Sequence, residues 1–130
     1  MTVVDASALL ELLLGTSRGA RVEARLLDPN ETLHAPHLID LEVTQVLRRY
    51  VLAHDLSVIR AGQALDDFLD LPLLRYPHYL ILPRVWQLRH NLTAYDAAYV
   101  ALAEVLKAPL VTCDGNLADA PGHRARIELL

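Results

Sequence analysis

Two short segments that each lead to an aspartate constrain the fold of this chain most. Residues 2–4 are β-branched and largely apolar and end at Asp5, and residues 110–112 are followed within two residues by Asp114. Runs of this kind are typical of strands buried on both faces of a parallel sheet. Because ligands bind outside the carboxyl ends of such strands, both aspartates are predicted to lie where a site can form.

Helical segments separate these strands. A leucine-rich run after Asp5 ends at Gly15, a natural helix C-cap, and predicts a heavily buried first helix. Further helices are predicted from Arg18 to about Leu27 and over residues 38–53, 58–71, 81–89 and 93–106, and further strands over 32–35, before Pro36 interrupts, and 73–76. The alternation predicts an α/β fold, a single domain over residues 1–130 with a mostly parallel central sheet of about four to five strands flanked by helices.

Composition excludes several classes of protein. Hydrophobic residues make up 53% of the chain and aromatic residues 5%, so a core of Leu, Val, Ile and Ala is expected and disorder is not. Cys113 is the only cysteine, which excludes an internal disulfide and a cysteine-cluster zinc site. No apolar run is long enough to cross a bilayer and no signal peptide is evident, so we expect a cytoplasmic protein with no membrane partner.

The formal net charge of −4 gives no general attraction to nucleic acid. Of the 12 basic residues, Lys107 is the only lysine. Arginine suits bidentate contacts to phosphate or carboxylate, although GC-rich coding also favours it.

Four acids are predicted to approach one another. Asp5 and Asp114 follow strands, Glu42 lies early in the helix over 38–53, and Asp96 lies in the first turn of the helix over 93–106. Converging carboxylates repel one another unless protons or a cation intervene, and Mg²⁺ prefers oxygen ligands. Such an ion activates water for phosphodiester hydrolysis, whereas the six histidines lack the spacing of a zinc hydrolase.

Structural roles account for the same four acids on the residues alone. Asp5 has the position of a helix N-cap, and Asp96 has capping-box spacing from Thr93. Glu42 has the pattern of a solvated helical residue, and Asp114 that of a turn former.

Four segments with matching order and spacing resemble the PIN-domain family, and within it the VapC-type toxins of toxin–antitoxin pairs. The resemblance covers essentially the whole chain and rests on residues 3–9, 42–43, 92–103 and 110–118. It implies that Asp5, Asp96 and Asp114 hold Mg²⁺, or Mn²⁺ in its place, directly or through water. Glu42 is implied to help bind or orient the ion.

The resemblance also assigns supporting residues. Ser7 is expected to hydrogen-bond within the acidic cluster or to cap the first helical turn, and Thr112 and Asn116 are expected in supporting or turn-bonding roles. Tyr95 and Tyr99 flank Asp96, where aromatic core packing is favoured over stacking on a base.

The implied partners are RNA as substrate, a VapB-type antitoxin and a second copy of the chain in a homodimer. The leucine-rich first helix and a row of arginines predict either a docking groove for the antitoxin or a core helix beside a solvated face; the row is Arg18, Arg21 and Arg25. Trp86 is predicted in the core or at a dimer contact.

The function implied is Mg²⁺-dependent endoribonuclease activity, as the toxin of a VapBC-type system. The alternatives are a non-catalytic PIN module that binds RNA or protein, and a DNA-cleaving nuclease. A haloacid-dehalogenase-type phosphotransferase needs a second Asp where Ser7 stands, and a response-regulator receiver needs a Lys near its last strand, whereas Lys107 precedes it.

Overall fold

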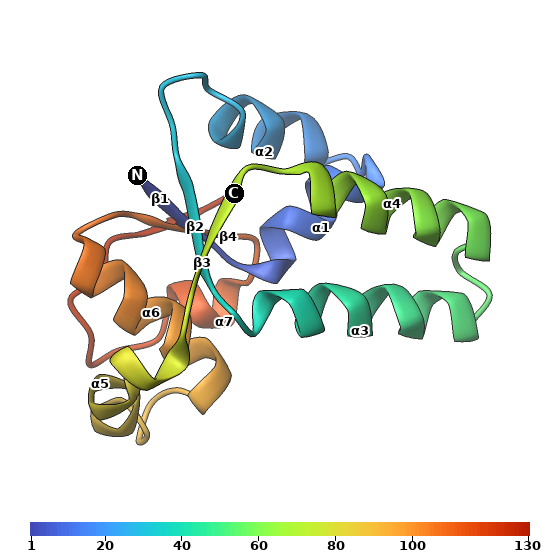
Figure 1. Ribbon diagram of the computed structural model, residues 1–130. Coiled ribbons are helices and arrows are strands. Elements are labelled where there is room, and N and C mark those ends of the chain that lie inside the picture. The colour runs from blue at the N-terminus through green and yellow to red at the C-terminus, as the bar shows by residue number, and fades with distance from the viewer.

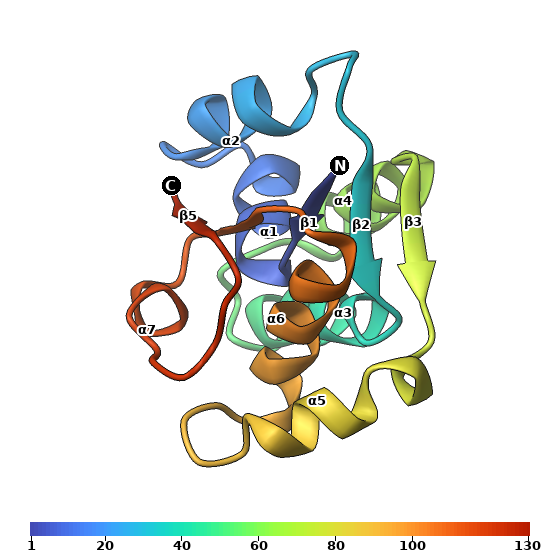
Figure 2. The same ribbon diagram turned by 90° about the vertical axis from the view of Figure 1, so that its left-hand side faces the viewer.

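Five short parallel strands form the central sheet of the computed structural model, which describes residues 1–130. They are β1 (Thr2–Val4), β2 (Leu33–Pro36), β3 (Leu73–Tyr76), β4 (Leu110–Thr112) and β5 (Ile127–Leu129). Their order across the sheet is β3-β2-β1-β4-β5, with every neighbouring pair parallel (Figure 2). Val3 pairs with His34 on one side and with Leu110 on the other, so β1 lies at the centre. The α/β fold with a parallel sheet is confirmed.

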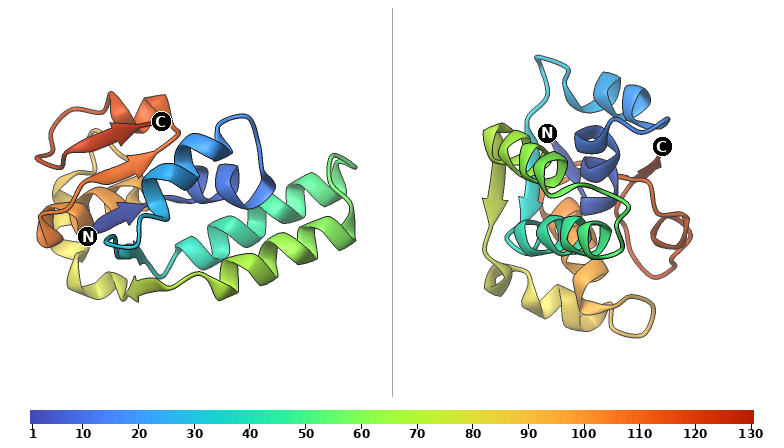
Figure 3. Two further views of the ribbon diagram at one scale, coloured as in Figure 1. Left: turned by 90° about the horizontal axis from the view of Figure 1, so that it is seen from above. Right: turned by 90° about the vertical axis from the view of Figure 1, so that its right-hand side faces the viewer.

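Helices cover both faces of the sheet. They are α1 (Ala6–Leu14), α2 (Gly19–Leu26), α3 (Ile39–Leu52), α4 (Val58–Asp70), the 3₁₀ turn η1 (His78–Leu80), α5 (Leu82–Gln87), α6 (Ala94–Leu106) and α7 (Gly115–Ala118). Figure 2 shows α6 in front of the sheet and α1 and α3 behind it, and the opposite view in Figure 3 agrees. Helices α3 and α4 lie side by side as a hairpin that extends away from the sheet (Figures 1 and 3). No helix has both the length and the apolar character needed to span a membrane.

The helix ends follow from capping residues in the sequence. Thr93 begins α6, and its hydroxyl accepts a hydrogen bond from the Asp96 amide at 3.2 Å. Ser57 begins α4 in the same way, accepting from the Arg60 amide at 3.0 Å. Gly15 ends α1 at a φ of 61°, in the left-handed region that glycine adopts without strain.

Three local predictions need correction. The strand predicted to stop before Pro36 includes this residue as its last, where it pairs with Tyr76 of β3. Strand β1 pairs with β2 only at Leu33 and His34, so the missing amide of Pro36 does not interrupt that pairing. The helix predicted over residues 81–89 is shorter, Leu82–Gln87, and the 3₁₀ turn precedes it. Strand β5 lies in a segment whose sequence predicts no strand, and it forms by pairing with β4.

The core lies between the sheet and the helices on either side. Val3, Val4 and Val111 have no exposed surface, so the strands that carry Asp5 and Asp114 are held rigidly. The leucines of α1 that face inward, Leu9 and Leu10 among them, are buried, which confirms the heavily buried first helix.

In the arginine row near α2, Arg18 and Arg21 are exposed to solvent and Arg25 is ion-paired. Arg25 forms ion pairs with Glu31 at 3.4 Å and Glu128 at 2.8 Å, while Arg21 is exposed. Together with the buried leucines of α1, this supports the alternative of a core helix beside a solvated face.

Candidate active site

Asp5 connects β1 to α1 and is buried. One carboxylate oxygen, Oδ1, accepts a hydrogen bond from the Ala8 amide at 3.0 Å, which makes Asp5 the N-cap of α1. The capping role expected of a strand-end acid is therefore real. The capping bond engages only Oδ1 of Asp5. The carboxylate still lies at the carboxyl end of the central strand, where a ligand site is expected.

Two hydroxyl groups hold the Asp5 carboxylate in place. Ser7 donates from Oγ to Oδ1 at 2.7 Å, and Thr112 donates from Oγ1 to Oδ2 at 2.5 Å. Ser7 Oγ in turn accepts from the Cys113 amide at 2.9 Å, which connects α1 to the segment after β4. The prediction that Ser7 bonds within the acidic cluster is confirmed.

Asp114 follows β4 and begins α7. Its amide donates to Thr112 Oγ1 at 2.9 Å, and its Oδ1 accepts from the Asn116 amide at 2.9 Å. Thr112 thus combines turn bonding with a contact to Asp5, while Asn116 contributes through its backbone. Oδ2 of Asp114 accepts no hydrogen bond from the protein, so this oxygen is available to a ligand.

Glu42 lies in the first turn of α3 and is not a freely solvated residue. The Tyr99 hydroxyl donates to Glu42 Oε1 at 2.6 Å, and the Tyr99 side chain is 1% exposed. Burial and the nearby negative charges raise the pKa of Tyr99, so its hydroxyl stays protonated and remains a donor. The sequence pointed to core packing for Tyr99 but not to this contact, although Tyr99 stands three residues after Asp96 on the same helix.

Asp96 lies in the first turn of α6, at the same end of the molecule. Its amide is engaged by Thr93, whereas its carboxylate forms no ion pair. Thr93 and Asp96 therefore form the first half of the predicted capping box. The carboxylate can act elsewhere without removing this cap.

Electrostatic coupling shows that the four acids share one neighbourhood. Burial raises the pKa of Glu42, and the negative charges of Asp5 and Asp96 raise it further. Burial likewise raises the pKa of Asp5 and of Asp96, and the charge of Asp114 adds to both increases, while hydrogen bonds from the Ser7 and Thr112 hydroxyl groups oppose the increase at Asp5. No ion pair of the protein includes any of the four acids. The cluster therefore carries negative charge that no Lys, Arg or His offsets.

The donor set fits a hard divalent cation. All four side chains offer carboxylate oxygens, and a cation would offset both the burial and the mutual repulsion that raise the pKa of Asp5, Glu42 and Asp96. No group of three or more His, Cys, Asp or Glu side chains is arranged closely enough to enclose an ion. Coordination by three of these acids at once would need side-chain rotation, whereas Mg²⁺ that keeps several waters needs only one or two direct carboxylates.

Comparison with known proteins places this geometry in a family. Residues 2–122 match the family model of the PIN domain. Ribonuclease VapC12 of Mycobacterium tuberculosis is 46% identical over 130 residues, which is 100% of this chain and 99% of the relative.

Solved structures have the same fold. The crystal structure of PAE2754 from Pyrobaculum aerophilum is 26% identical with a TM-score of 0.70, covering 97% of this chain and 81% of that one. VapBC2 from Rickettsia felis, bound to a DNA fragment from its promoter, has a TM-score of 0.71 at 14% identity, covering 99% of this chain and 98% of that one, and supports the fold. The chain belongs to the PIN-domain family, in the branch that contains the VapC proteins.

Proposed function

We propose that the chain is a Mg²⁺-dependent endoribonuclease and the toxin of a VapBC-type toxin–antitoxin pair. The observation that carries the proposal is the group of four neighbouring acids, none of which has a basic partner in an ion pair; burial and the charges of the other acids raise the pKa of Asp5, Glu42 and Asp96. The relative at 46% identity, a ribonuclease by name, supports the reaction class. Mn²⁺ is proposed to replace Mg²⁺, since both accept oxygen ligands.

The acids differ in the roles that their contacts allow. Asp114 has a carboxylate oxygen that accepts no bond from the protein, and Asp96 offers both of its oxygens, so these two are proposed as ligands. Asp5 is held from three sides and supplies a fixed carboxylate between them. Glu42, fixed by Tyr99, is proposed to bind or orient a coordinated water.

A bound Mg²⁺ would supply a water of lowered pKa and stabilise the charge that develops on the phosphodiester. The protein's part is then to keep its carboxylates ionised and correctly oriented. Ser7 and Thr112 do this for Asp5, because hydrogen bonds from hydroxyl groups favour the ionised form and oppose the effect of burial.

We propose that a VapB-type antitoxin places an apolar helix in the groove between α3 and α4. This groove has a volume of about 330 Å³ and is lined by side chains such as Leu47 and Val51 of α3 and Val58 and Leu65 of α4. Val58 is 73% exposed and Leu52, which lines the same groove, is 62% exposed, and adjoining exposed apolar side chains mark an interaction surface. The hairpin is the part of the fold that extends furthest from the sheet (Figure 1), and an amphipathic helix suits such a groove.

We propose further that two copies associate through the exposed face of α5. Trp86 is 67% exposed, so the core alternative predicted for it is wrong, and Leu82, which lines the same cavity, is 52% exposed. A cavity of about 560 Å³ adjoins Trp86 and can receive an apolar side chain. Trp86→Ser should shift the protein from dimer to monomer in light scattering; an unchanged dimer would place the interface elsewhere.

Cleavage of labelled RNA with Mg²⁺, and with the metal removed by EDTA, tests the central proposal. Asp114→Asn should abolish cleavage while the folded state is retained. Asp66→Asn is the matched control, because Asp66 is an exposed acid of α4 outside the cluster, and it should cleave as the wild type does.

Other outcomes point to other functions. RNA binding without cleavage under any metal condition would favour a non-catalytic PIN module. Cleavage of DNA in preference to RNA would favour a DNA nuclease.

A further inference from the structure

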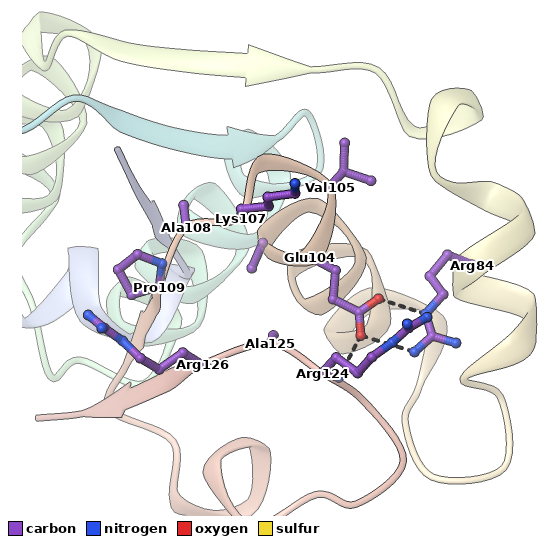
Figure 4. Close-up of a pocket in the computed structure, with 10 residues that line it drawn as sticks. Arg84, Glu104, Val105, Lys107, Ala108, Pro109, Arg124, Ala125 and Arg126 are labelled. Carbon is purple, nitrogen blue, oxygen red and sulfur yellow. Dashed lines mark hydrogen bonds and ion pairs between the residues drawn. The ribbon is translucent and has the colours of Figure 1, made fainter.

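A basic cavity lies at the end of α6 that is opposite to Asp96. It has a volume of about 620 Å³ and lies between α5, the end of α6 and the segment that enters β5 (Figure 4). Its charged lining consists of Arg84, Lys107, Arg124, Arg126 and Glu104, that is, four positive groups and one negative, a formal charge of +3. The whole chain carries −4, so positive charge is concentrated here.

The carboxylates nearby do not neutralise this charge. Glu104 accepts from Arg84 Nε at 2.7 Å and Nη2 at 3.0 Å, and also from the Arg124 amide at 2.7 Å (Figure 4). Glu128, which accepts from Arg126 at 2.6 Å, is shared with Arg25.

Two cations of the lining form no ion pair, although the charge of Arg124 contributes to lowering the pKa of Glu104. The Lys107 ammonium and the Arg124 guanidinium take part in no ion pair. Lys107 ends α6, where a cation also interacts favourably with the helix dipole, but this accounts for one of the four positive groups.

Without a bound cation, the acidic site repels a polyanion. Its four acids form no ion pair with a basic residue, and none of them lines the basic cavity. Affinity for RNA comes largely from neutralising phosphates with Lys and Arg, so a nuclease with this site needs cations elsewhere on its surface.

Helix α6 relates the basic cavity to the acidic site, since Asp96 lies in its first turn and Lys107 at its end. At about 1.5 Å of rise per residue, these positions are roughly 16 Å apart along the axis. At roughly 3.4 Å per phosphate of a helical strand, this distance corresponds to on the order of five nucleotides.

We propose that this cavity binds backbone phosphates of the RNA substrate, at a distance of several nucleotides from the bond that is cut. Guanidinium groups suit phosphate because they donate two parallel hydrogen bonds to it. The proposal rests on the ribonuclease function proposed above. It assigns to the cavity the retention of long RNA and no part in the chemical step.

The test is a double variant, Lys107→Gln with Arg124→Gln, which removes the two cations without ionic partners. Glutamine is polar and keeps the first three side-chain carbons of lysine and arginine, and the amide of Arg124 still donates to Glu104. The control is Arg21→Gln with Arg49→Gln, which lowers the net charge equally at exposed arginines that form no ion pair. Thermal unfolding should be the same for all three proteins.

Binding of single-stranded RNA of about four and about twenty nucleotides is measured in EDTA at several salt concentrations, so that cleavage does not intervene. Every phosphate of a single strand that the protein no longer neutralises lowers the slope of log Kobs against log salt by about 0.7, so the double variant should show a slope smaller by roughly 1.4 on the longer RNA. The control should retain the wild-type slope, and the shorter RNA should bind all proteins alike. On long RNA with Mg²⁺, KM should rise while kcat is unchanged.

A slope equal to that of the control would overturn the proposal. So would a variant that binds RNA normally but loses affinity for an acidic peptide such as oligoglutamate, because the surface would then be a protein-docking face. If the wild type cleaves no RNA but the slope still falls, the phosphate site is supported and the ribonuclease function fails.

Discussion

The hydroxyl of Tyr99 on α6 donates a hydrogen bond of 2.6 Å to Glu42 on α3, and this contact links the two helices that supply acids to the site from outside the strands. Tyr99 is buried, so its position is set by the core. A rigid core residue thereby orients a half-buried carboxylate.

Tyr99→Phe removes this donor with almost no change of volume. We expect RNA cleavage to fall roughly ten- to a hundredfold, the usual effect of removing a residue that orients a metal-site group. The free energy of unfolding should fall by about 1 kcal/mol, because Glu42 is only half-buried and water replaces the missing hydrogen bond. Tyr95→Phe is the matched control, since Tyr95 is 67% exposed on the same helix, and an equal loss of activity in both variants would contradict the orienting role.

Asp5→Asn should abolish cleavage, yet the metal-free protein should be as stable as the wild type or more stable. The folded-state pKa of Asp5 is raised above 3.8, mainly by burial, so ionised Asp5 opposes folding at neutral pH. Protonated Asp5 favours the folded state, so this contribution to stability is fully present below the pKa of Asp5 in the unfolded chain and is lost as the pH rises through its folded-state pKa. In denaturant unfolding with EDTA, the free energy of unfolding of the variant should therefore rise relative to that of the wild type as the pH increases through this window. Cleavage by the variant at the wild-type rate would refute the catalytic assignment.

Substitutions at Asp96 and Thr93 separate a helix cap from a metal ligand. Thr93→Ala removes the hydroxyl that accepts from the Asp96 amide and should cost roughly 0.5 to 2 kcal/mol of stability while leaving much of the activity. Asp96→Asn keeps that amide, so it should cost no more stability but reduce cleavage by orders of magnitude. If both variants retained cleavage at saturating Mg²⁺, Asp96 would be a helix-terminal residue only.

A crystal soaked in Mn²⁺ should show anomalous density between Asp5, Asp96 and Asp114, with Glu42 in direct or water-mediated contact. Because no three acids are arranged to enclose an ion, we expect one or two direct carboxylates and waters at the other positions. Density at another place, or none at saturating Mn²⁺, would contradict the proposed metal centre. Calorimetry in solution, with Asp66→Asn binding normally and Asp114→Asn binding weakly, provides an independent check.

Local chemistry made much of this architecture predictable. The apolar segments that end at Asp5 and Asp114 indicated the buried strands, and Gly15 and Thr93 marked helix ends that the structure confirms. These features depend on neighbours within a few residues, because capping and strand propensity are local effects. The expected site acids came from strand ends and from the family resemblance, and their metal-binding role stays a prediction.

Features set by residues far apart in the chain were decided only by the tertiary structure. Strand β5 has little strand signal and exists because β4 offers it a pairing edge. Thr112 contacts Asp5 across 107 positions of sequence, and the Tyr99 hydroxyl reaches Glu42 across 57. The sequence by itself determined which residues could begin and end each element, whereas packing around β1 decided which side chains meet, because such contacts form only when the burial of the whole core holds distant segments together.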